Sequence, residues 1–200
     1  MALFIPNQNG RMVVAYMVML SLLGIAAPGV TFADELSKES VLPLGTANKA
    51  IQTALEACKK DGYRVSVSVV DRAGALRAMG RADGAGPHTV DSSRKKAYTA
   101  ASVRRPTSEL ADLITKVPTL QALRDMNAET LILGGGLPIE IGGEIVGGIG
   151  VGGAPGAHLD DACAQEGLDA IGAAPKVPTS KSKLKSGDGL PSLEVWRFSA

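Results

Sequence analysis

The sequence LPIEIGGEIVGGIGV, which occupies residues 137–151, is the most informative part of this 200-residue chain. Two apolar runs flank the pair Gly142-Gly143, and a pair of glycines in that position favours the two-residue turn of a β-hairpin. The second run continues with several glycines, although glycine weakens a strand. We therefore predict an antiparallel hairpin whose second strand lies very close to a helix, a ligand or a neighbouring subunit.

The same glycines satisfy the spacing of a nucleotide-binding motif. Residues 148–153 read GIGVGG, which matches G-x-G-x-x-G. A dinucleotide site needs a helix to begin directly after these glycines, so that the helix N-terminus faces the pyrophosphate. Here Pro155 and Gly156 follow, and a predicted hairpin precedes. The pattern therefore indicates a closely packed strand rather than a dinucleotide site.

Outward from this hairpin, the sequence predicts a second hairpin and several helices. Helices are expected where small and apolar residues recur at three- and four-residue spacing, over residues 44–60, 88–102, 107–114 and 158–171, with a shorter turn over 120–126. The alternation of β-branched residues over 65–70 predicts a further strand, and residues 75–81 are expected to form the return strand of the same hairpin. Since the two hairpins are separated by helices, the order predicts an α+β fold with an antiparallel sheet.

The N-terminal residues 1–33 have the plan of a secretory signal peptide. An apolar run from Met12 to Ala27 follows Arg11, and small residues stand at the −3 and −1 positions of a cleavage site after Ala33. The run is shorter than the roughly 20 apolar residues of a spanning helix, and an uncleaved anchor is the alternative. We therefore expect a periplasmic or secreted protein that is not stably inserted in a membrane.

The remaining sequence divides into three expected parts. Residues 34–43 are predicted to form a linker, residues 44–174 the folded domain, and residues 175–200 a flexible basic tail. Trp196 and Phe198 are unusual for a tail, and the sequence offers no account of them.

Charge and cysteine content narrow the classes of function. Loss of Arg11 with the signal peptide leaves 20 of the 21 basic residues against 20 acidic ones, and this balance argues against nucleic acid as a partner.

Export allows a disulfide between Cys58 and Cys163, which would add about 4 kcal/mol by closing a long loop. The alternative is two buried free thiols. Two cysteines without a C-x-x-C spacing do not predict a zinc site.

Side chains suited to chemistry are few. His88 and His158 are the two histidines, and each is predicted at the start of a helix. Without a G-x-S-x-G elbow, the sequence does not favour hydrolase chemistry. After His88 come the basic residues Arg94 and Lys95, and Arg94 shares a helix face with Tyr98. A solvated helix face is the simpler interpretation of this stretch.

Several ordered motifs together resemble the GlcG/HbpS-like family, which shares its domain with the C-terminal part of PduO-type proteins. The resemblance covers roughly residues 44–172 and rests on VVDRAG at 69–74, RADGA at 81–85, DSSRKKAYTA at 91–100, GGLPI at 135–139 and GEIVGGIGV at 143–151. It implies a layered αβα domain with an antiparallel sheet of about five strands, assembled into symmetric homo-oligomers. It also implies haem as the leading ligand, because family members include extracellular haem-binding proteins.

Haem needs few protein ligands, because the porphyrin supplies four of the iron's bonds. His88 is the predicted metal ligand, with Tyr98 and Met126 as substitutes. Arg94 and Lys95 are predicted to pair with the haem propionates. Cofactor binding is thus assigned to His88, Arg94, Lys95 and Tyr98.

Three functions remain open at this stage. The first is haem or iron handling or sensing by an exported binding protein without a catalytic cycle. The second is an enzyme or accessory protein acting on a small organic acid such as glycolate, held by Asp71, Arg81, Asp83 and Arg94. The third is a structural oligomer whose glycine-rich strand packs between subunits.

Overall fold

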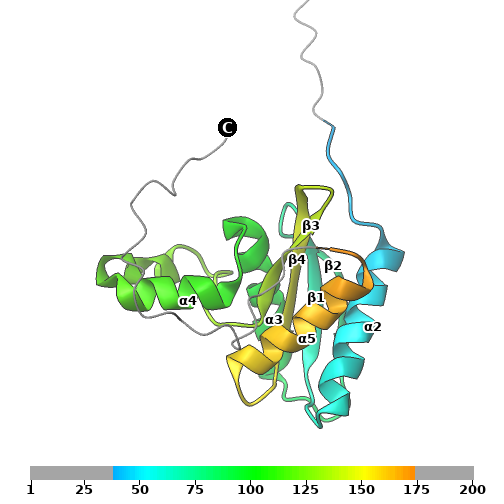
Figure 1. Cartoon of the computed structure of the whole chain (residues 1–200). Helices are drawn as coiled ribbons and strands as arrows, with labels where there is room; N and C mark the ends of the chain where they lie inside the picture. The colour runs from blue at the N-terminus through cyan, green and yellow to red at the C-terminus, as the bar shows by residue number, and fades with distance from the viewer. Residues whose placement is uncertain (1–37, 174–200) are drawn as a thin grey trace, which may run out of the picture. The chain divides into compact units, whose positions relative to one another are not determined.

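The computed structural model describes residues 38–173. The predicted signal peptide, the first part of the linker, residue 174 and the predicted tail over residues 175–200 lie outside the described residues. The elements drawn in Figure 1 are α2 (Leu44–Lys60), β1 (Ser66–Asp71), β2 (Leu76–Arg81), α3 (His88–Val103), α4 (Thr107–Lys116), the 3-10 helix η1 (Pro118–Asp125), β3 (Gly136–Ile141), β4 (Glu144–Gly152) and α5 (Ala157–Ala170). Both hairpins and the predicted helices are confirmed. No helix within this range is long and apolar enough to cross a membrane.

The strands form one antiparallel sheet in the order β2-β1-β4-β3. The α+β class with an antiparallel sheet is therefore confirmed. The expectation of about five strands is wrong for residues 38–173, which contain four. Each hairpin supplies two strands, and the segment between the hairpins forms α3, α4 and η1 instead of a further strand.

The two faces of β1 bury different kinds of side chain. Ser66 and Ser68 face α3, because their hydroxyl groups hydrogen-bond those of Thr89 (2.7 Å) and Ser93 (2.8 Å). The valines that alternate with these serines belong to the main core, together with residues of α2 and α5. Since side chains alternate across a strand, α3 lies on one face of the sheet and α2 with α5 on the other.

The glycines of β4 allow the backbone of α3 to lie directly on the sheet. A Cβ atom at Gly148 would lie 2.3 Å from the Ala97 carbonyl oxygen, and one at Gly150 would lie 2.1 Å from that of Ser93. Real Cβ contacts are never this short, so neither position accepts a side chain without movement of α3. The close approach predicted from the sequence is therefore confirmed, and the neighbour is a helix backbone.

A disulfide joins Cys58 of α2 to Cys163 of α5, with 5.5 Å between their Cα atoms. The question that the sequence left open is thereby answered in favour of the bridge. Gly167 of α5 lies against Ala50 and Ala54 of α2, so the two helices run in opposite directions. The end of α5 consequently lies beside the start of α2, as Figure 1 shows.

Candidate functional site

One face of β2 carries large apolar side chains that no helix covers within residues 38–173. Leu76 and Met79 lie opposite Val70 and Ser68 of β1, and opposed residues in antiparallel strands share a face. This face points to the side of α3, yet α3 packs on β1, β3 and β4. Leu76 and Met79 are therefore 50% and 40% exposed. We call these two side chains the open face of β2.

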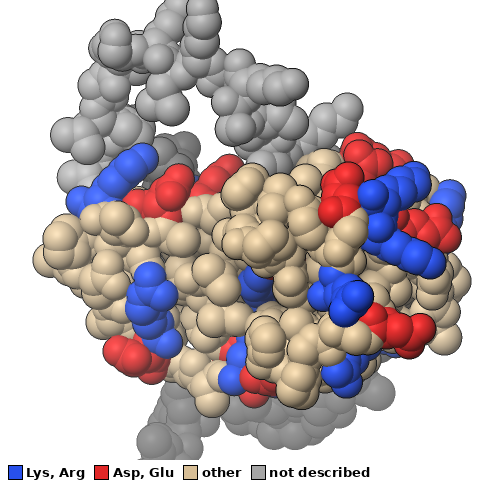
Figure 2. Space-filling model, turned by 90° about the horizontal axis from the view of Figure 1, so that it is seen from below, with Lys and Arg blue, Asp and Glu red and all other residues tan. Residues whose placement is uncertain are grey.

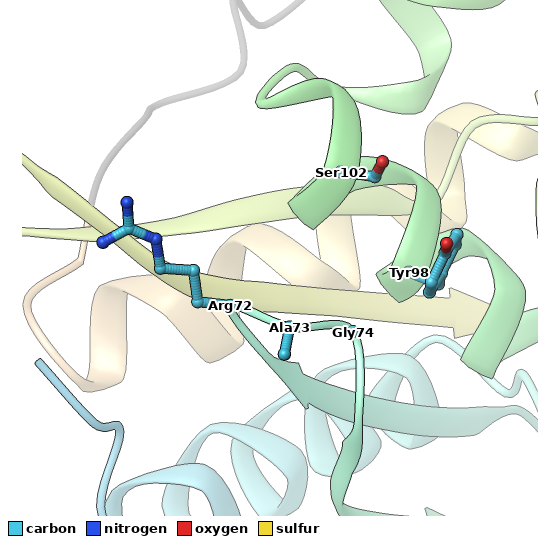
Figure 3. Close-up of a pocket in the computed structure, with 5 residues that line it drawn as sticks. All are labelled: Arg72, Ala73, Gly74, Tyr98 and Ser102. Atoms are coloured by element: carbon cyan, nitrogen blue, oxygen red, sulfur yellow. The ribbon is translucent and has the colours of Figure 1, made fainter. Parts of the chain in front are cut away.

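A hollow lies between the β1–β2 turn and the C-terminal half of α3 (Figure 3). Its lining consists of Arg72, Ala73, Gly74, Tyr98 and Ser102. The Tyr98 ring packs so closely on the turn that a Cβ atom at Gly74 would lie 2.6 Å from its Cδ2 atom. The volume of this hollow is about 80 Å³. Pockets for drug-sized ligands measure about 300–1,000 Å³, so this hollow alone does not enclose a large ligand.

The basic side chain at this hollow is already paired. Figure 3 shows the Arg72 guanidinium pointing away from Tyr98. It donates a hydrogen bond to Glu144 at 3.0 Å and lies 3.9 Å from Glu39. Arg72 therefore ties the two hairpins to the segment that precedes α2.

The predicted propionate ligands are paired as well. Arg94 donates to Glu129 and, at 3.0 Å, to Asp91, and Lys95 pairs with Asp91 at 3.0 Å. Its hydrogen bond to Glu129 raises the pKa of Arg94, and the same bond lowers that of Glu129. The hydrogen bond from Lys95 holds the pKa of Asp91 below its ordinary value. A carboxylate of a ligand would have to compete with Asp91 and Glu129 for these cations.

His88 is the first residue of α3 and is exposed. Its ring lies over the loop that precedes the helix, because a Cβ atom at Gly86 would be 2.6 Å from the His88 Cε1 atom. His158 is placed in the same way over Gly156 at the start of α5. The His88 imidazole is therefore accessible to a ligand in solution. Met126, the other substitute, is exposed directly after η1.

The structure separates the predicted ligands into two places. His88 and Tyr98 are ten residues apart on α3, which corresponds to roughly 15 Å at 1.5 Å per residue. One iron atom cannot be bound by both. Tyr98, but not His88, lines the hollow. A haem ligated by His88 would consequently lie at the start of α3, whereas a haem ligated by Tyr98 would lie beside the C-terminal half of the helix.

The residues proposed to hold an organic acid are not gathered in one place. Asp71 accepts hydrogen bonds from the amides of Ala73 and Ala75 in the β1–β2 turn. Arg81 lies opposite Ser66 at the far end of the hairpin, roughly 16 Å from Asp71 at 3.3 Å per residue. Both side chains stabilise loops, since Arg81 donates to the carbonyl oxygen of Ala85.

Sequence reasoning missed a buried ion pair between the helices. Lys96 of α3 is 2% exposed and donates to Asp160 of α5 at 2.8 Å and to the Val151 carbonyl oxygen at 3.0 Å. Burial raises the pKa of Asp160, against the opposing effect of the Lys96 cation. Burial also raises that of Asp161, which accepts a hydrogen bond from the Gly135 amide. The spacing could have indicated this burial, because Lys96 follows Ser93 by three residues and therefore shares the face of α3 that packs on the sheet.

Sequence reasoning also missed the open face of β2. Leu76 and Met79 read as ordinary residues of a return strand, and the sequence does not say that α3 leaves this strand uncovered. Figure 2 shows one face of the molecule, seen from below, on which Lys and Arg side chains are interspersed with Asp and Glu among uncharged residues. This view shows no continuous basic surface of the kind that binds nucleic acid.

Comparison with known proteins agrees with this fold. The model of the family described as "Haem degrading protein HbpS-like" matches residues 42–169. A double mutant of HbpS from Streptomyces reticuli is 45% identical and has a TM-score of 0.64, with 72% of this chain and 96% of that chain covered. The PduOC:haem complex is 26% identical with a TM-score of 0.63, over 68% of this chain and 98% of that one.

Protein GlcG of Escherichia coli K12 is 32% identical over 111 residues, which are 56% of this chain and 81% of GlcG. The chain belongs to the HbpS-like family. The resemblance found in the sequence motifs is therefore confirmed.

Proposed function

We propose that this protein is an exported haem-binding protein that handles or senses haem or iron. The observation that supports this proposal most directly is the fold shared with a PduO domain crystallised with haem. The greater sequence identity to HbpS, over nearly all of that chain, supports it further.

The residues of this chain offer two features that a porphyrin requires, an apolar surface and an axial ligand. The open face of β2 supplies apolar side chains for the flat ring, and haem iron accepts either imidazole or phenolate as an axial ligand. His88 is an exposed imidazole, and the Tyr98 phenol lines the hollow beside β2. When bound, haem would supply the redox and ligand-binding chemistry of its iron, while the protein would orient the ring.

The same observations support a homo-oligomer. The hollow is too small to enclose haem, and Leu76 and Met79 are open to solvent among the described residues. A second copy of the chain would supply the missing wall of a haem pocket. The disulfide between α2 and α5 supports export, because such bonds persist in oxidising compartments.

Haemin titration of the chain from residue 34 onward tests the proposal. We expect a sharp, shifted Soret band that saturates at a fixed stoichiometry. Loss of this band in His88→Ala but not in Tyr98→Phe assigns the iron to the start of α3, and the reverse result assigns it to the hollow. A spectrum equal to that of free haemin would refute haem binding. Light scattering of the same samples reports the assembly.

A further inference from the structure

The outer edge of β2 has no strand beside it in the part of the chain that the structure describes. β2 is the first strand of the sheet, and β1 pairs with its inner edge only. An edge strand presents free amide and carbonyl groups that can pair with another extended segment. The edge adjoins the open face formed by Leu76 and Met79, so a strand added there would find both hydrogen-bonding groups and an apolar surface.

Arg77 in the same strand has an unsatisfied polar atom. Its Nε atom is buried without a hydrogen-bond partner, while its Nη2 atom donates weakly to the Leu42 carbonyl oxygen at 3.4 Å. Buried N–H groups nearly always have an acceptor. Because Arg77 reaches the segment before α2, its side chain lies on the face of β2 opposite to Leu76 and Met79, and it places Leu42 close to β2.

The chain itself contains a segment suited to this place. Residues 193–198 read LEVWRF, rich in the β-branched and aromatic residues that favour strands. They include Trp196, the one tryptophan of the sequence, and lie beyond residue 169, where the family match ends. The segment carries one acidic residue, Glu194, and one basic residue, Arg197, so it brings no net positive charge to β2, which carries Arg77 and Arg81.

The chain between residue 173 and Leu193 is long enough to reach the edge of β2, and it begins close to that strand. α5 ends beside the start of α2, and Arg77 reaches the Leu42 carbonyl oxygen just before that start. The described chain therefore ends near β2. About 20 residues separate it from Leu193, and an extended chain of that length spans roughly 66 Å. The intervening segment can reach any part of the edge of β2.

We propose that residues 193–198 pair with the outer edge of β2 as an added strand and place Trp196 over Leu76 and Met79. The docked segment covers the open face of β2 in the ligand-free chain, and haem could occupy that face only after the segment leaves it. Its docking does not require haem, and haem binding is measured by haemin absorption rather than by the experiment below.

Fluorescence of Trp196 in the chain from residue 34 onward tests this docking without any added ligand. We expect a blue-shifted emission maximum and acrylamide quenching several-fold weaker than in a free peptide of residues 190–200. In Leu76→Asp and Met79→Asp the emission should move to that of the free peptide. Leu133→Asp is the matched control, because Leu133 is a similarly exposed leucine away from β2, and its emission should remain blue-shifted.

Hydrogen exchange distinguishes backbone pairing of the segment with β2 from a contact made by the Trp196 side chain alone. Truncation after residue 189 should accelerate exchange of the outward-facing amides of β2, and far-UV circular dichroism should show that the domain remains folded. Emission equal to that of the free peptide in the unaltered chain would overturn the proposal, as would exchange of β2 that truncation does not change. A blue shift that disappears on dilution would show docking between two copies and would also overturn it.

Discussion

Replacing Lys96 by methionine removes the cation of the buried ion pair that links α3 to α5. Lys96 and Asp160 have side chains 2% and 4% exposed, and their charged atoms are 2.8 Å apart. Methionine fills a similar volume but leaves the Asp160 carboxylate without its cation. Removal of one partner from a buried pair typically costs about 3–5 kcal/mol of unfolding free energy, and we expect a loss in this range at pH 7.

The loss should depend on pH with a definite sign. Burial already raises the pKa of Asp160, and Lys96 opposes that rise. Without the cation the pKa of Asp160 rises further, so the folded variant takes up a proton at a higher pH than the unfolded chain does. The stability gained by this protonation is present at acid pH and is lost as the pH increases through the raised pKa. The difference between variant and parent should therefore be largest at neutral pH and smaller in acid.

Urea denaturation at pH 7 and at mildly acid pH measures both effects. Lys95→Met is the matched control, because Lys95 is a more exposed neighbour whose pair with Asp91 is worth about 0.5 kcal/mol. The double variant Lys96→Met with Asp160→Asn should recover most of the loss, since asparagine can still accept the hydrogen bond from the Ala154 amide. A loss below about 1 kcal/mol, or one independent of pH, would refute the reasoning.

Three further predictions concern the packing, the disulfide and the surface charges. Gly150→Ala should destabilise by about 1–3 kcal/mol or more in urea denaturation, because α3 must move, whereas Gly45→Ala, with nothing within 4 Å, should be neutral or stabilising. Replacing Cys58 and Cys163 together by serine should lower the unfolding free energy by about 4–5 kcal/mol, which is the loop-entropy value for a separation of 105 residues. An unchanged thermal midpoint of the double variant in non-reducing buffer would contradict the bridge. NMR titration should give the Glu129 carboxyl a pKa below its ordinary value, because the Arg94 guanidinium donates a hydrogen bond to it. The contribution of this pair to stability is therefore present at neutral pH and is lost as the pH falls. An ordinary pKa for Glu129 would exclude its pair with Arg94 in solution.

Local sequence patterns predicted much of the fold. The pair Gly142-Gly143 between apolar runs predicts a hairpin, and the alternation after Val65 predicts a strand, because both depend on residues that are neighbours in the chain. The fifth strand came from resemblance rather than from any pattern in these residues, and the described chain does not contain it.

The candidate site was predicted less completely. The sequence singled out His88 and Tyr98, and the structure places them ten residues apart on α3. It assigned Arg94 to a ligand, but the carboxylates of Asp91 and Glu129 already pair with that side chain. Glu129 lies 35 residues along the chain from Arg94, and no local pattern reports a partner at that separation.

By itself the sequence determined the helices, the hairpins and the close approach of some neighbour to the glycines of β4. These features follow from the spacing of apolar residues and from the absence of a Cβ atom, which act over a few residues. The tertiary structure alone decided that the disulfide forms, that Lys96 meets Asp160 and that Leu76 and Met79 stay uncovered. Each of these depends on how elements distant in sequence pack together, because burial and pairing are properties of the assembled sheet and helices.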